Sequence, residues 1–231
     1  MKVVILAGGL GTRLSEYTKS IPKPMVSVGG KPIIHHIMRH YSNNGFNEFI
    51  VAAGYKQHII RDFFKKDKNK WNIKIIDTGK NTMTGGRIRR LKKYLNKEDF
   101  LVTYGDGISN VNIKKLVLFH KTNKKIVTLT AVRPPARFGE IVIKKNSVKS
   151  FKEKPQTSKG WINGGFFVAN TNFLKFIRGD SEILERYPLE KVTKLKQLSA
   201  YKHFGFWKCM DVKRDREELQ KIYKSKKTLL F

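Results

Sequence analysis

Three glycines, a threonine and an arginine follow a short apolar run near the start of the chain. The run covers Val3, Val4, Ile5, Leu6 and Ala7, and the residues after it are Gly8, Gly9, Leu10, Gly11, Thr12 and Arg13. A strand that ends in a glycine-rich loop exposes successive backbone N–H groups, and such a loop binds phosphate. Arg13 can grip a phosphate with its planar fork, and Lys23 adds a point charge held between two prolines. The pattern predicts a phosphate-binding site.

Two common glycine motifs do not fit this loop. The P-loop needs a Gly-Lys-Ser/Thr end, which is not in the sequence. The dinucleotide fingerprint needs a third glycine where the chain has Leu14. The loop therefore represents a different kind of nucleotide site. A plain tight turn in an α/β core would not account for Arg13 and Lys23.

Asp106 is the first candidate metal ligand. It lies between Gly105 and Gly107, directly after the apolar run Phe100–Tyr104. In open α/β sheets the ligand crevice lies at the carboxyl ends of the strands. Mg²⁺ prefers carboxylate and phosphate oxygens, so we expect Asp106 to hold it. The alternative is an ordinary Asp-Gly turn. For Asp211, at the start of a polar segment, the residues alone suggest a helix N-cap.

Two further polar segments are candidates for substrate contact. In the first, Thr84 can cap a helix, and the amides of Gly85 and Gly86 would face a ligand beside Arg87. In the second, Asn163 and Gly164 enter an apolar strand, and Glu153 and Lys154 precede it; these carry hydroxyl and phosphate binding groups. A lone Glu-Lys pair is usually only surface. For base recognition, the segments 52–55 and 84–87 are both candidates.

Histidine and cysteine give weaker signals. His36 and His40 are four residues apart on a predicted helix, but no third ligand is evident, so we expect packing or surface histidines. Cys209 is the single cysteine and has no evident base beside it, so a structural thiol is expected.

The composition limits the cellular setting. The chain has 231 residues, 40% of them hydrophobic, and a net charge of +30. The lysine pairs are scattered and are not interleaved with aromatic residues, which argues against nucleic acid as a partner. No run is long enough to span a membrane, no signal peptide is evident, and one cysteine fits a reducing cytoplasm. We expect a cytoplasmic protein with small-molecule substrates.

Apolar runs and helical periodicity alternate along the first 132 residues. Strands are predicted at 3–7, 49–53, 73–76, 100–104 and 126–132, and helices at 33–41, 58–64, 87–95 and 113–121. After residue 132 a hairpin is expected at 140–151, a strand at 161–168, helical segments at 173–177 and 189–195, a strand at 199–203 and a helix at 213–226. We predict one domain, with a nucleotide-binding core at 1–132 and a sugar-binding part and C-terminal helix at 133–231.

The glycine-rich loop with its Pro-Lys-Pro turn resembles the signature of the sugar-phosphate nucleotidyltransferases, the NDP-sugar pyrophosphorylases. Other segments follow in family order over nearly the whole chain: Tyr104–Gly107, Glu153–Pro155, Asn163–Gly165 and Gly205–Asp211. Segments 77–79, 83–87, 134–139 and 205–207 are similar to the branch that uses CTP and glucose 1-phosphate. The resemblance implies a Rossmann-like, three-layer α/β fold with a mixed, mostly parallel sheet, flanking helices and a small β-rich sugar-binding lobe.

The resemblance also implies a reaction and a role for each residue. The sugar 1-phosphate attacks the α-phosphorus of the triphosphate in line, and pyrophosphate leaves. By the resemblance Asp106 and Asp211 hold Mg²⁺, and Arg13 and Lys23 neutralise the triphosphate. Nucleotide contacts are assigned to Leu6, Ala7, Gly8, Gly9, Gly11, Thr12, Thr84, Gly85 and Arg87, and sugar-phosphate contacts to Tyr104, Glu153, Lys154, Asn163 and Gly164. It implies a homo-oligomer. A sister enzyme that uses UTP, dTTP or GTP, or another phosphorylated acceptor, stays open.

The sequence departs from the branch in one region. A long insertion that the branch carries between Phe64 and Ile73 is replaced here by a short loop rich in Lys, Asp and Asn. In the family that region helps to build subunit contacts and surrounds the active site. The departure bears on the assembly and on the choice of nucleotide and sugar. A basic nucleic-acid-binding or regulatory protein without catalysis is a remote alternative.

Overall fold

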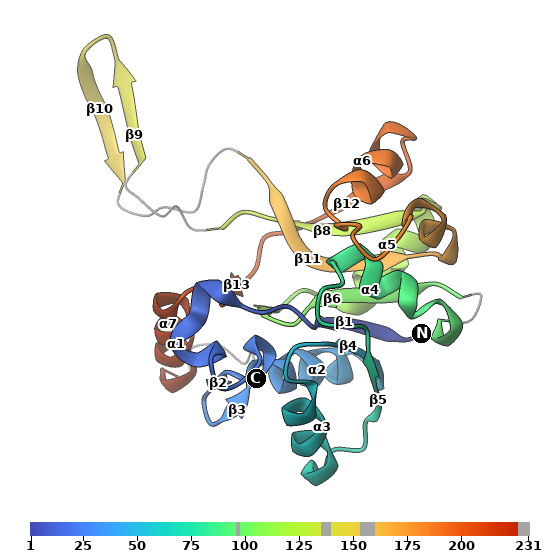
Figure 1. Cartoon of the computed structure of the whole chain (residues 1–231). Helices are drawn as coiled ribbons and strands as arrows, with labels where there is room; N and C mark the ends of the chain where they lie inside the picture. Colours follow the sequence, from blue (N-terminus) through green and yellow to red (C-terminus); the bar gives the residue numbers. More distant parts are fainter. Residues whose placement is uncertain (96–97, 135–139, 153–159, 226–231) are drawn as a thin grey trace.

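A seven-stranded mixed sheet forms the centre of the chain (Figure 1). The computed structural model describes residues 1–95, 98–134, 140–152 and 160–225. The strand order is β12-β8-β11-β6-β1-β4-β5. The strands are β1 (Val3–Ala7), β4 (Glu48–Ala53), β5 (Asn72–Asp77), β6 (Phe100–Tyr104), β8 (Val127–Val132), β11 (Ile162–Ala169) and β12 (Leu198–His203). Only β11 runs antiparallel to its neighbours in this sheet, so the expected mixed, mostly parallel sheet is confirmed.

The strand β1 lies between β6 and β4 and is buried along its whole length. Successive side chains of a strand point to opposite faces of the sheet. The odd residues of β1, Val3 and Ile5 among them, belong to one hydrophobic cluster. Its even residues, Val4 and Leu6, belong to a second. A continuous apolar run is therefore needed here, since both faces of β1 are covered.

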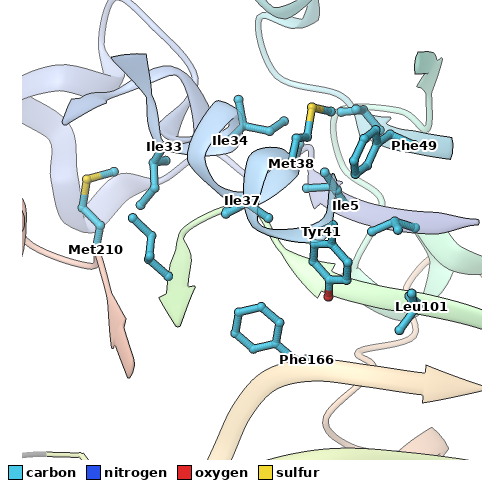
Figure 2. Close-up of a cluster of buried hydrophobic side chains, with 14 of the residues drawn as sticks. Ile5, Ile33, Ile34, Ile37, Met38, Tyr41, Phe49, Leu101, Phe166 and Met210 are labelled. Atoms are coloured by element: carbon cyan, nitrogen blue, oxygen red, sulfur yellow. The ribbon is translucent and has the colours of Figure 1, made fainter. Parts of the chain in front are cut away.

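Helices cover both faces of the sheet. The first face is covered by α2 (Ile33–Asn43), α3 (Gln57–Lys66), α5 (Ile113–Asn123) and α7 (Lys213–Lys224). The second is covered by α4 (Thr84–Arg90), α6 (Tyr187–Lys194) and a 3-10 helix at Thr171–Phe176. The apolar residues at helical spacing on α2 are all buried, and Figure 2 shows them in one cluster with Ile5, Leu101, Phe166 and Met210: Ile33, Ile34, Ile37, Met38 and Tyr41. The three-layer α/β class is confirmed.

Several short elements complete the fold. A helix α1 (Ser15–Thr18) and 3-10 helices at Thr12–Leu14 and Lys23–Met25 follow the glycine-rich loop. Small antiparallel pairs are formed by β2 (Ser27–Val28) with β3 (Lys31–Pro32), and by β7 (Gly107–Ser109) with β13 (Trp207–Cys209). The ribbon of β9 (Glu140–Lys144) and β10 (Ser147–Lys152) is the predicted hairpin, and Figure 1 shows it projecting away from the sheet.

Two predicted helices differ from the structure. The basic segment expected to be helical through Leu95 is α-helical only to Arg90, and a short 3-10 helix at Lys92–Tyr94 follows. The segment expected at 173–177 is a 3-10 helix over Thr171–Phe176. The division of the chain at residue 132 stays a prediction. None of the helices in the described residues combines the length and the apolarity of a membrane span.

Candidate active site

A cavity of about 540 Å³ opens where β1 and β6 end, at the carboxyl ends of the parallel strands. Fourteen of the predicted site residues line it: Leu6, Ala7, Gly8, Gly9, Gly11, Thr12, Arg13, Lys23, Thr84, Arg87, Tyr104, Asp106, Asn163 and Asp211. Gly85 and Gly164 do not line it, and Glu153 and Lys154 lie outside the described residues. Residues that were not predicted to belong to the site also line it, among them Met83, Trp207 and Cys209. Parallel strands therefore bring the separate motifs to one crevice, as expected.

The glycine-rich loop is held by its backbone and leaves one glycine open. Gly11 has a φ of +67°, in the left-handed region, and its carbonyl accepts bonds from the Leu14 amide (2.9 Å) and the Thr18 hydroxyl (3.0 Å). A Cβ at Gly8 would come within 2.1 Å of the Arg87 guanidinium. A Cβ at Gly9 would meet no described atom within 4 Å, and Gly9 is exposed. Gly9 is therefore where a ligand has free access to the loop.

Lys23 joins the two aspartates. Its Nζ lies 2.7 Å from Oδ2 of Asp106 and 3.0 Å from Oδ1 of Asp211, and all three side chains are mostly buried. Burial alone would lower the pKa of Lys23, but the charges and hydrogen bonds of Asp106 and Asp211 outweigh it, so this pKa is raised. Arg13, whose side chain is 73% exposed, pairs with the second oxygen of Asp211. Two carboxylates and two cations thus meet at one end of the cavity.

The pairing of β7 with β13 brings the two aspartates together. Cys209 lies opposite Gly107 in this pair, and the Met210 amide donates to the Asp106 carbonyl (2.8 Å). Asp106 directly precedes β7, and Asp211 lies two residues beyond β13. The contact spans about a hundred residues of sequence, so no local pattern indicates it.

The side chain of Asp211 does not cap the helix that follows it. The carboxylate of Asp215, in the first turn of α7, accepts bonds from the amides of Asp211 (3.0 Å) and Val212 (2.9 Å). This is the carboxylate half of a capping box. The N-cap interpretation of Asp211 is therefore wrong, and its carboxylate is turned to Lys23 and Arg13.

Arg87 holds the backbone around the glycine-rich loop. Its side chain is buried, and burial lowers the pKa of its guanidinium below the usual value. Its donors reach the carbonyls of Gly8 (3.0 Å), Ala53 (3.3 Å), Gly79 (2.7 Å) and Lys80 (3.3 Å), and the Thr78 hydroxyl (2.7 Å). Direct contact of Arg87 with a nucleotide stays a prediction, whereas its bond to Gly8 already ties it to the loop.

The start of α4 is covered by a distant segment of the same chain. The amides of Gly85 and Gly86 both donate to the carbonyl of Glu182 (3.0 and 3.2 Å), so the expectation that they face a ligand is wrong. Thr84 does not cap the helix either. Its hydroxyl accepts a bond from the Leu184 amide (2.9 Å) and donates to the carboxylate of Glu185 (2.9 Å). Tertiary contacts replace the local cap here.

Tyr104 and Asn163 meet on the other side of the cavity. The Asn163 amide donates to the Tyr104 hydroxyl (3.3 Å), and its carbonyl oxygen accepts from the Gly165 amide (2.8 Å). Gly165 has a φ of +79°, and a Cβ there would come within 2.5 Å of the Tyr104 ring. Gly164 contributes its carbonyl, which accepts from the Trp207 indole (2.7 Å). The Tyr104 hydroxyl donates a hydrogen bond to Glu185, a residue that the sequence does not indicate.

The histidines and the cysteine have structural surroundings. His36 and His40 are bonded to the carbonyls of Val28 (2.8 Å) and Val111 (2.9 Å), which confirms the packing interpretation. Within the described residues, no three His, Cys, Asp or Glu side chains come together as a metal site. Burial, with the nearby aspartates, raises the pKa of Cys209 to about 11, so it is a neutral thiol at physiological pH.

Comparisons with known proteins show which family the chain is similar to. The nucleotidyl transferase family model matches residues 2–205. The chain is 42% identical over 250 aligned residues to the glucose-1-phosphate cytidylyltransferase of Salmonella typhimurium, covering 98% of this chain and 97% of that protein. It is 38% identical over 245 residues to a probable glucose-1-phosphate cytidylyltransferase of Bacillus subtilis, covering 96% of both. Both alignments are longer than the 231 residues of the chain, so both relatives carry residues that this chain lacks.

A solved structure shows the same fold. The structure of UDP-glucose pyrophosphorylase complexed with UDP-glucose has a TM-score of 0.76 with this chain, covering 98% of it and 99% of that chain at 17% identity. At this identity the likeness concerns the fold, which is that of the nucleotide-diphospho-sugar transferases. Because the family model matches most of the chain, the chain belongs to the nucleotidyl transferase family.

Proposed function

We propose that this chain joins CTP and α-D-glucose 1-phosphate to give CDP-glucose and pyrophosphate. The observation that carries the proposal is the cluster of Lys23, Asp106 and Asp211 beside the open glycine-rich loop. The two cytidylyltransferase relatives, matched over nearly their whole length, support this choice of nucleotide and sugar.

The residues of the cavity suit an in-line displacement at phosphorus. Such a reaction needs positioning and charge neutralisation rather than a covalent group on the protein. Arg13 is exposed enough to turn toward a triphosphate, and Lys23 stands next to it at the same carboxylate. The open face of Gly9 lets phosphate oxygens approach the backbone. We assign Arg13, Lys23 and the loop to the triphosphate.

The two aspartates fit a divalent cation. One oxygen of Asp106 and one of Asp211 already converge on a single nitrogen, so the same two oxygens can hold one small cation. Mg²⁺ typically takes one or two carboxylates and completes its shell with water and substrate phosphates. When bound, it would neutralise charge that builds up on the reacting phosphates. Lys23 would then be released from the aspartates to bind phosphate.

The sugar phosphate is assigned to the side of the cavity that holds Tyr104 and Asn163. Both side chains line the cavity and present polar atoms to it. Glu153 and Lys154 complete the proposal from the resemblance alone, because they lie outside the described residues.

We also propose that the protein is a cytoplasmic homo-oligomer. The ribbon β9–β10 supports the assembly. Ile143 lies opposite Val148 and Ile141 opposite Phe151, so the four side chains share one face, and each is at least 50% exposed. Burying this face against another copy would remove apolar surface from water. Sedimentation of the chain and of Phe151→Glu tests the proposal: a smaller species is expected for the variant.

The reaction is tested by measuring pyrophosphate release with Mg²⁺ and glucose 1-phosphate, with one nucleoside triphosphate in each reaction. Release with CTP and little with the others is expected. Pyrophosphate release with UTP, dTTP or GTP instead would support the same type of reaction but with a different nucleotide from the one proposed. The control is Asp106→Asn, which keeps the size of the side chain and removes its charge. Absence of turnover with every triphosphate and several sugar phosphates would contradict the proposal and leave a non-catalytic protein.

A further inference from the structure

Glu185 connects the two sides of the cavity. It lies in the turn before α6, and its residue is exposed although both of its carboxylate oxygens are bonded. One oxygen accepts the hydroxyl of Tyr104, at the end of β6. The other accepts the hydroxyl of Thr84, at the start of α4 (2.9 Å). These three residues come from three separate parts of the chain.

The position of Glu185 is fixed by the buried residue that precedes it. The amide of the preceding residue, Leu184, donates to the same Thr84 hydroxyl (2.9 Å), and the Leu184 side chain is only 2% exposed. The Glu182 carbonyl, in the same segment as Leu184, accepts hydrogen bonds from the amides of Gly85 and Gly86 in α4. Glu185 is therefore held in place before any ligand arrives.

The contact decides what the Tyr104 hydroxyl can do. A phenol has one proton to donate, and an ionised carboxylate can only accept. Because the Tyr104 proton points to Glu185, the phenol oxygen offers only acceptor capacity to the cavity. The Asn163 amide is its other described partner, and at 3.3 Å that bond is long. A ligand atom that meets this oxygen must therefore donate: a sugar hydroxyl can, and an ionised phosphate oxygen cannot.

We infer that Glu185 is a positioning residue that makes Tyr104 a hydrogen-bond acceptor for a hydroxyl of the sugar. The inference rests on the proposed function and adds to it the residue that sets the direction of this hydrogen bond.

The test is Glu185→Gln, which keeps the side-chain shape and removes the charge. The amide can donate as well as accept, so the Tyr104 proton is no longer fixed. We expect the KM for glucose 1-phosphate to rise about tenfold, the value of one hydrogen bond, with the KM for CTP and the kcat nearly unchanged. Glu190→Gln is the matched control, with the same change at an exposed position on α6, and should match the wild type.

A double-mutant cycle separates positioning from a general structural effect. Tyr104→Phe alone should raise the KM for glucose 1-phosphate by a similar factor, and adding Glu185→Gln should raise it no further. Equal losses for both substrates, or additive losses in the double variant, would overturn the inference.

A second readout does not need turnover. With the tyrosines labelled with ¹³C at Cζ, and the Tyr104 signal assigned by its loss in Tyr104→Phe, Glu185→Gln should shift that signal and Glu190→Gln should not. An unshifted signal would overturn the inference even if the enzyme is active. A shifted signal in a protein that turns over no substrate would leave the pairing intact and refute the proposed function instead.

Discussion

Replacing Arg87 by methionine separates its structural role from a role in nucleotide binding. Methionine fills similar volume but cannot donate, so every bond that the guanidinium makes to the protein is lost. Two of the acceptors keep another donor: the Gly8 carbonyl keeps the Tyr55 amide (3.2 Å), and the Ala53 carbonyl keeps the Thr78 amide (2.9 Å). The Gly79 carbonyl (2.7 Å) and the Lys80 carbonyl (3.3 Å) lose their described donor. The Thr78 hydroxyl loses the donor at 2.7 Å but still donates to the Ala53 carbonyl.

The magnitude follows from the two short bonds, those to the Gly79 carbonyl and the Thr78 hydroxyl. A hydrogen bond to a charged group contributes about 1.5–3 kcal/mol to stability. A buried acceptor that is left without a partner costs about 1–3 kcal/mol. Part of the loss is offset because the buried charge disappears, and burial already lowers the pKa of Arg87. We therefore expect the free energy of unfolding to fall by about 2–4 kcal/mol, which lowers the urea midpoint by about 1–2 M for a slope of about 2 kcal/mol/M.

Urea unfolding of Arg87→Met and of Arg89→Met is the assay. Arg89 is two residues on in the same helix and is exposed, so it controls for loss of charge and of helix propensity. Arg89→Met should unfold at the wild-type midpoint. If Arg87→Met also unfolds at the wild-type midpoint and only its KM for CTP rises, Arg87 is a nucleotide ligand and the structural reasoning is refuted.

Three further predictions concern the loop, the carboxylates and the histidines. Gly8→Ala should destabilise the fold by about 1–3 kcal/mol because its Cβ would clash with Arg87. Gly9→Ala should leave the urea midpoint unchanged and raise the KM for CTP, since a Cβ there meets no described atom. Equal urea midpoints for the two variants would contradict this prediction. Lys23→Met should bind Mn²⁺ in the absence of nucleotide about tenfold more tightly, measured by electron paramagnetic resonance, because the ammonium no longer occupies the carboxylate pair; an unchanged affinity would show that Lys23 and the metal do not compete. Burial lowers the pKa of five histidines in the folded chain, including His36 and His40. Below pH 6.5 the unfolded chain therefore binds more protons than the folded chain, and the urea midpoint should fall when the pH is lowered from 7.5 to 5.5. A midpoint that rises on acidification would disprove this prediction.

The sequence alone predicts the sheet core and one wall of the site. The apolar run of β1 and the helical spacing on α2 reflect burial that each element must have, so both were correctly predicted. The glycine-rich loop, Lys23 and Asp106 are also predictable, because each belongs to a local pattern of residue types. All of them line the cavity.

The remaining features depend on contacts between distant segments. Thr84 has the residue type of a helix cap, but the segment around Glu182 and Leu184 supplies the partners that a cap would supply. Asp211 has the residue type of an N-cap, but Val212 is the N-cap residue, and the carboxylate of Asp215 accepts from the amides there. Arg87 has the residue type of a phosphate ligand; it donates to the carbonyls of Gly8 and Gly79, and its contact with a nucleotide stays a prediction. For Thr84 the partners are about a hundred residues away, and for Asp211 the residue one turn on decides the cap, so the local pattern does not contain either role.

The central claim is best tested by a competition. The protein is incubated with Mg²⁺, glucose 1-phosphate and equal amounts of CTP, UTP, dTTP, GTP and ATP, and the nucleotide sugars formed are identified by mass spectrometry. We predict CDP-glucose as the main product and its loss in Asp106→Asn. A different nucleotide sugar as the main product, or CDP-glucose at the wild-type rate in Asp106→Asn, would contradict the account.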